Sequence, residues 1–182
     1  MDVNRTLLKT SIKLVNLLDK AADEALPQEI ADVVKLHSKL AVASSWIPVP
    51  GADVAAGAAT IWGMYIRINN KIGLAVKDNV VKTIGSGVAT NLAGYAATSG
   101  VASALKFIPG IGTIGGAIIM SATLYAITLA SGYIYLQALT LLAEKSGGSL
   151  DTSQIGNAVK EVLKEKTVIK DFINEAKKSY KK

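Results

Sequence analysis

The sequence has no cysteine and a single histidine, His37, among its 182 residues. Disulfide bonds and thiolate metal sites are therefore excluded. One histidine without a carboxylate at metalloprotease spacing does not predict a metal centre either, so we expect His37 to be structural or to lie on the surface. No set of acid, base and nucleophile residues stands out, which predicts a protein that is not an enzyme and that needs no cofactor.

Charged residues are scarce, at 19% of the sequence, whereas soluble domains average about 25%. Half of the residues are hydrophobic, and the mean hydropathy is +0.35. Between Thr83 and Ala143 the one charged residue is Lys106. A segment so poor in ionisable groups must be sheltered from water, either by lipid or by other helices of the same chain.

The net charge is +6, which is compatible with nucleic acid, an anionic membrane or an acidic partner. Aromatic residues make up only 5% of the chain and do not alternate with the basic residues. A base-stacking surface requires that alternation, so we do not expect nucleic acid as a partner. Membrane lipid is the partner that the composition favours.

Residues 3–25 have the apolar periodicity of an amphipathic helix. Its polar face carries four cations: Arg5, Lys9, Lys13 and Lys20. Two interpretations remain open: a helix that lies on anionic lipid, and a helix docked on the protein with its basic face in water. The first residues lack the order of a basic and then an apolar region, so we expect no cleaved signal peptide.

A second helix is expected from Pro27 to about residue 45, and a third from 52 to 69. Pro48 and Pro50 separate them, because neither fits inside a helix. Asp53 falls in the first turn of the third helix. There its carboxylate would either cap the free N–H groups or serve a partner or an ion.

The uncharged segment divides at a turn-forming run that contains Lys106, Pro109, Gly110 and Gly112. Its halves, 83–105 and 114–143, are each long enough for one membrane span of about 20 residues. A basic flank precedes the first half: Arg67, Lys71, Lys77 and Lys82. The pattern predicts a membrane hairpin with both termini in the cytoplasm and Lys106 near the far surface.

Small residues would let such helices pack closely. Gly112 and Gly116 have the GxxxG spacing, and Ala89, Ala93 and Ala97 form a ladder. A short internal repeat also occurs at a constant offset of 59, in which residues 42–44, 50–51 and 57–58 match 101–103, 109–110 and 116–117. The repeat predicts two αα-hairpins that share one core.

The C-terminal segment reads as a further amphipathic helix after a Gly-rich link. Asp151 would cap it, with Gln154 reaching back as in a capping box. The apolar seam steps by four and three residues with one charged interruption, through Ile155, Val159, Val162, Lys166, Ile169, Ile173, Ala176 and Tyr180. We expect one helix, or two that are separated near Thr167.

Together these patterns predict an all-α bundle of about six to seven helices, built on two αα-hairpins with a hydrophobic central hairpin. We divide the chain into an amphipathic N-terminal helix (1–26), a hydrophobic core (28–145) and a basic amphipathic C-terminal segment (150–182).

Two runs carry a resemblance to a known family: residues 47–53 with the following helix and Lys71-Ile72-Gly73, and the turn at 107–112. Over about residues 30–143, the chain resembles a bacterial domain family of unknown function that is fused to, or encoded beside, Era-like small GTPases. The resemblance implies an all-helical, membrane-associated domain. This chain has no GxxxxGK[ST] phosphate loop, so a nucleotide-driven role would need a separate GTPase as partner.

The leading functional hypothesis is a non-enzymatic membrane protein of the inner membrane, a scaffold or partner of a membrane process that also associates with further copies of itself. The alternative is a soluble bundle that shelters its hydrophobic hairpin and later inserts it to form a pore. Recovery without detergent would separate the two.

Overall fold

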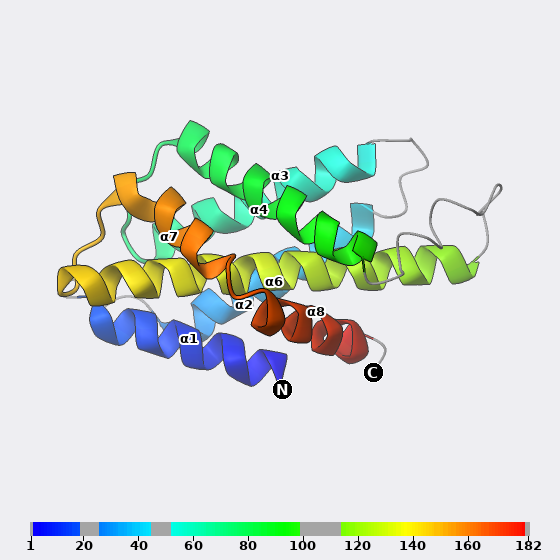
Figure 1. Ribbon diagram of the computed structural model, residues 1–182, viewed down its shortest axis with the longest axis horizontal. Helices are drawn as coiled ribbons and strands as arrows, with labels where there is room; N and C mark the ends of the chain where they lie inside the picture. The colour runs from blue at the N-terminus through cyan, green and yellow to red at the C-terminus, as the bar shows by residue number, and fades with distance from the viewer. Residues whose placement is uncertain (1, 19–25, 45–51, 99–113, 181–182) are drawn as a thin grey trace.

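The computed structural model describes residues 2–18, 26–44, 52–98 and 114–180 (Figure 1). Over these ranges the protein is all-α, as predicted, and contains seven α-helices and one 3₁₀ turn but no strand. The helices are α1 (Val3–Leu17), α2 (Pro27–Ser44), α3 (Ala52–Lys71), α4 (Asp78–Thr98), α6 (Ile114–Ser146), α7 (Ile155–Val162) and α8 (Lys166–Tyr180), with the turn η1 (Thr152–Gln154) before α7.

The long helix α6 is the axis of the bundle. It lies across the middle of Figure 1 and packs against all of the other α-helices described: α1, α2, α3, α4, α7 and α8. Helices α3 and α4 lie on one side of it, and α1 lies on the other. The hydrophobic core therefore forms around one helix rather than between two equal layers.

Helix α1 begins at a side-chain cap that the sequence analysis did not identify. The Asp2 carboxylate accepts hydrogen bonds from the backbone N–H groups of Asn4, at 3.0 Å, and Arg5, at 3.2 Å, which satisfies two donors that the helix itself cannot. The helix buries Val3, Leu7, Leu14 and Val15 against the core. It ends at Leu17, and residues 19–25 of the predicted helix lie outside the described residues.

The predicted limits of α2 and the start of α3 are confirmed, and α3 continues to Lys71, two residues beyond its predicted end. Helix α2 begins at Pro27 and ends at Ser44, and α3 begins at Ala52. The prolines between them lie outside the described residues. Helices α2 and α3 pack against each other, as do α4 and α6, whereas the turns of the proposed repeat are not described.

The C-terminal end of α6 is closed by two glycines in the left-handed region, Gly147 (φ +65°) and Gly148 (φ +100°). The Gly148 N–H donates to the Ala143 carbonyl at 2.9 Å, a bond of the Schellman type. The helix therefore continues three residues beyond the predicted end at residue 143.

The last two helices follow the predicted seam closely. Asp151 caps as expected, accepting from the Ser153 N–H at 2.9 Å, but Gln154 does not complete a capping box, because its side chain accepts from Asn157 Nδ2 at 3.0 Å instead. The seam breaks between Val162 and Lys166, just before the expected point. Lys166, the charged interruption, is exposed. The buried members of the seam, on both helices, are Ile155, Val159, Val162, Ile169, Ile173 and Ala176.

Candidate functional site

The feature that the sequence singled out, the apolar second half of the uncharged segment, forms the centre of α6. By length and composition, this helix could cross a membrane from Ser121 to Ser146. Of its most apolar 18-residue stretch, however, 83% is buried within the protein. No other helix in the described ranges meets that criterion. Shelter for this segment therefore comes from the surrounding helices.

The first half of the predicted hairpin, residues 83–105, was expected to form a membrane span. Helix α4 covers residues 78–98 and does not qualify as a span. Its outer side exposes small and polar residues, among them Thr83, Thr90 and Asn91. Ala89, the first residue of the predicted small-residue ladder, is half-buried against the core, and the ladder itself stays a prediction. Nothing is described for the side chains of Ala93 and Ala97 on the same helix.

The predicted turn lies outside the described residues. This applies to Lys106, Pro109, Gly110 and Gly112. Gly116 falls in the first turns of α6, so the GxxxG contact stays a prediction.

Close helix contacts are made instead by two other glycines. A Cβ atom on Gly132 would lie 2.4 Å from Val34 Cγ1, and one on Gly85 would lie 2.6 Å from Trp62 Cδ1. Both distances are too short for a carbon contact. Gly132 thus allows α2 to approach α6, and Gly85 allows α4 to approach α3. Neither glycine lies in a spacing motif that would have indicated a close helix contact.

Helix α6 is also attached to α3 by polar contacts. The Tyr65 hydroxyl lies 2.7 Å from Ser131 Oγ and donates to the Ser131 carbonyl at 3.1 Å. One turn further along both helices, the Tyr135 hydroxyl donates to Asn69 Oδ1 at 2.8 Å. Each pair advances by four residues on each helix, so α3 and α6 run parallel here.

These contacts form a compact cluster within the apolar core. The rings of Tyr65 and Tyr135 stack, with centroids 4.0 Å apart, and Tyr65, Asn69, Ser131 and Tyr135 are all buried. Burial raises the pKa of the Tyr65 hydroxyl far above its usual range, so the group remains protonated and acts as a neutral donor. The cluster orients α6 against α3 within the bundle.

His37 has a structural role, which is one of the two roles expected from the sequence. It is buried on α2, and its Nδ1 donates to the Val33 carbonyl at 2.9 Å. Burial lowers the pKa of His37, the bond to Val33 acts in the opposite direction, and the positive charge of Arg67 lowers it further. The imidazole is therefore favoured in its neutral form.

The residues of the predicted basic flank are exposed, and one of them is paired. Lys71 forms an ion pair with Glu29 of α2. Arg67, Lys77 and Lys82 are exposed, and none has an ion-pair partner within the described ranges. Asp53 lies in the first turn of α3, as expected, but its side chain is not described.

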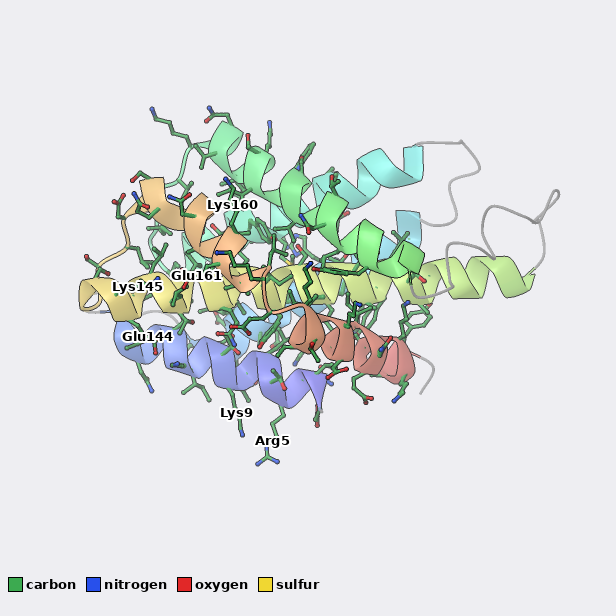
Figure 2. The ribbon with its side chains drawn as sticks, viewed as in Figure 1. Arg5, Lys9, Glu144, Lys145, Lys160 and Glu161 are labelled. Carbon is green, nitrogen blue, oxygen red and sulfur yellow. The ribbon has the colours of Figure 1, made fainter. Side chains whose placement is uncertain are left out.

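Other exposed charges join α6 to its neighbours. Lys13 of α1 contacts Glu144 at 2.7 Å, and Lys145 contacts Glu161 of α7 at 2.9 Å. Arg5 and Lys9 of α1 instead extend away from the body (Figure 2).

Two open cavities lie near the Lys145–Glu161 pair. Their volumes are about 310 and 260 Å³, and Glu161 lines both. In the described part of the chain, no three residues of the His, Cys, Asp or Glu types gather where they could hold a metal ion. The first cavity is lined by both members of the pair, and the second by Glu144, Glu161 and Glu165.

Comparison with known proteins gives one curated relative. Over 107 residues, the chain is 29% identical to magnetosome membrane protein 22 of Magnetospirillum gryphiswaldense, a match that covers 58% of this chain and 55% of the relative. The chain thus spans about half the length of that relative. No family model and no solved structure matches the chain, so the resemblance to the GTPase-associated family stays a prediction. The chain is similar, over this segment, to a protein described as a membrane protein.

Proposed function

We propose that the protein is a non-enzymatic helical bundle that associates with the cytoplasmic side of the inner membrane, where it acts as a scaffold or partner in a membrane process. The similarity to magnetosome membrane protein 22 supports the membrane association. The mode of association is inferred from the burial of α6, the one candidate span of the described chain. Of the most apolar 18-residue stretch of this helix, 83% is buried inside the protein.

Burial of this helix favours attachment of the assembled bundle over a permanent hairpin. A helix that spans a bilayer presents its apolar side chains to lipid, but α6 presents them to α1, α2, α3, α4, α7 and α8. To reach lipid, α6 would have to leave contacts such as Tyr65 with Ser131. The outward charges of the surrounding helices are also costly to bury in hydrocarbon.

Membrane fractionation tests this proposal. The protein should sediment with membranes at low salt and should be released by high salt or by alkaline carbonate without detergent, because surface attachment depends on charge. Recovery in the soluble fraction under every condition would overturn membrane association. A requirement for detergent would overturn surface attachment and favour a span.

A second candidate is an inserting form, in which α6 leaves the bundle and enters the bilayer to form a pore. The uncharged length of α6 from Ser121 to Ala143 supports it, since that length matches the hydrocarbon core. Release of an encapsulated dye from anionic vesicles would support insertion. Intact vesicles at neutral and acidic pH, with the protein bound, would leave only surface attachment.

The proposed partners beyond lipid follow from the sequence alone. A separate GTPase is expected from the family resemblance, and further copies of the chain would supply a homo-oligomer. Light scattering and pull-down with a purified Era-like GTPase, in the GTP and GDP states, would test each of them.

A further inference from the structure

The outer face of α1 is the most uniformly basic surface that one described helix offers. Helix α1 contains Arg5, Lys9 and Lys13 and neither Asp nor Glu. Arg5 and Lys9 are exposed, point away from the bundle (Figure 2), and have no ion-pair partner among the described residues. Lys13, in contrast, is held by Glu144. The two outward cations are thus available to an external anion.

An apolar side chain lies on the same face. Arg5, Lys9, Ile12 and Asn16 step by four, three and four residues, so they line one side of the helix. Ile12 is 41% exposed, unlike the core residues of the same helix. The opposite side is anchored by Val3, Leu7 and Leu14, all buried, which fixes the direction in which the basic face points.

We propose that this face of α1, with Arg5, Lys9, Ile12 and Asn16, docks on an anionic phospholipid bilayer. The inference rests on the proposed membrane association and names the surface and the lipid class. The argument is charge complementarity: Arg5 and Lys9 form no ion pair among the described residues, although the Asp2 carboxylate caps the same helix, and such exposed cations are attracted to an anionic leaflet. Ile12 enters the headgroup boundary, and the bundle, α6 included, stays assembled above it.

A nucleic acid and an acidic protein have the same charge as the lipid. Nucleic acid is disfavoured because this face carries no aromatic residue on which a base could stack. An exposed isoleucine between cations suits an interface with apolar depth better than it suits a phosphate backbone. The observations therefore favour the bilayer, and the experiment below includes a DNA duplex as the competing anion.

The test measures partition of the purified chain between buffer and vesicles. We compare vesicles of neutral phosphatidylcholine with vesicles that contain anionic phosphatidylserine, in low and in high salt. The variant Arg5→Gln/Lys9→Gln should bind anionic vesicles roughly thirtyfold more weakly, since each cation near such a surface contributes a factor of roughly five. The matched control, Lys77→Gln/Lys82→Gln, removes the same charge from the α4 region of the predicted basic flank and should bind as the parent does.

A local probe reports which face meets the lipid. Because the chain has no cysteine, Asn16→Cys and, as control, Asn91→Cys each give one site for a polarity-sensitive dye. Asn16 and Asn91 are both exposed. Anionic vesicles should shift the emission of the dye at position 16 to the blue and leave the dye at position 91 unchanged.

The outcomes distinguish this inference from the proposed function. If the parent binds anionic vesicles but Arg5→Gln/Lys9→Gln binds equally well, or the control variant loses as much, the docking face is wrong and membrane association stands. If the parent binds neither kind of vesicle nor cell membranes, the proposed function fails. Binding to a DNA duplex in preference to vesicles, with loss in the Arg5→Gln/Lys9→Gln variant, would replace lipid by nucleic acid.

Discussion

Most of α4 and most of α6 come from the same uncharged segment of sequence, residues 83–143, yet the two helices occupy different environments. Between Ser121 and Ala143, α6 is buried on nearly all sides. Helix α4 buries one stripe, including Val81, Val88 and Leu92, and exposes small and polar residues on the other side. The absence of charge therefore does not by itself predict burial. The size and polarity of the remaining side chains decide it, because large aliphatic groups gain most on leaving water.

A new charge in each helix should give the largest contrast. Leu129 of α6 is fully buried, so Leu129→Asp would place an unpaired carboxylate in the core and should destabilise the fold by more than about 4 kcal/mol. Asn91→Asp on the exposed side of α4 should change the stability by less than about 0.5 kcal/mol. Urea denaturation followed by circular dichroism measures both. Similar losses for the two variants would mean that α4 is as enclosed as α6.

Glycine-to-alanine changes should have opposite signs in the two helices. Gly132→Ala in α6 would drive a methyl group into Val34 and should cost about 1–3 kcal/mol. Gly87→Ala in α4 meets no atom within 4 Å and should stabilise the protein by about 0.5–1 kcal/mol, because alanine is the better helix former. Thermal unfolding of the pair measures both signs. Destabilisation by Gly87→Ala would indicate a close neighbour at position 87, in addition to the one at Gly85.

Helix α4 contacts α3 through a part-buried hydrogen bond from Trp62 Nε1 to Ser86 Oγ at 3.2 Å, whereas the polar contacts of α6 with α3 are buried. Tyr65→Phe removes the hydroxyl that bonds Ser131 and should cost about 1–2 kcal/mol. Ser131→Ala should cost a similar amount, and the double variant should lose less than the sum of the two, with a coupling above about 0.5 kcal/mol. Denaturant titration of the four proteins gives that coupling. Strict additivity would mean that the two groups do not interact.

Acidification should affect the α2 side of the bundle more than α4. The folded-state pKa of His37 lies below its ordinary value of 6.5, so the unfolded chain takes up the proton first. The stability that the neutral His37 contributes is fully present above pH 6.5, and it is lost as the pH falls below that value towards the folded-state pKa. Hydrogen exchange should therefore accelerate in α2 on going from pH 7 to 5.5, after correction for the intrinsic rate, and less so in α4.

The variant His37→Gln provides the control for this smallest effect. Its stability should change less between pH 7 and 5.5 than that of the parent, because it lacks the group that titrates in this window. Equal pH dependence of the two proteins would show that other groups cause the loss.

Local patterns allowed most helix limits to be predicted. Pro27 and the prolines at 48 and 50 bracket α2. The seam from Ile155 to Ala176 predicted one helix or two, and the structure shows two, α7 and α8. These features depend on residues near one another in the sequence, where spacing carries the information. The N-terminal cap at Asp2 is equally local, and its signal is an aspartate directly before the first apolar residue of the helix, Val3.

Contacts between distant residues could not be predicted in the same way. Tyr65 and Ser131 are separated by 66 positions, and nothing in either neighbourhood indicates the other. The close approach at Gly132 likewise depends on where Val34 of α2 lies. The sequence predicts that the segment 114–143 is sheltered from water, by lipid or by other helices. Only the fold shows that helices of the same chain surround α6.

Cysteine accessibility of α6 tests this enclosure most directly. Ala138 is fully buried, Asn91 is exposed, and the chain has no native cysteine. In protein purified without detergent, Ala138→Cys should resist a water-soluble maleimide until denaturant is added, whereas Asn91→Cys should react at once. Rapid labelling at position 138 in the folded protein, or a fold that survives only in detergent, would contradict the account.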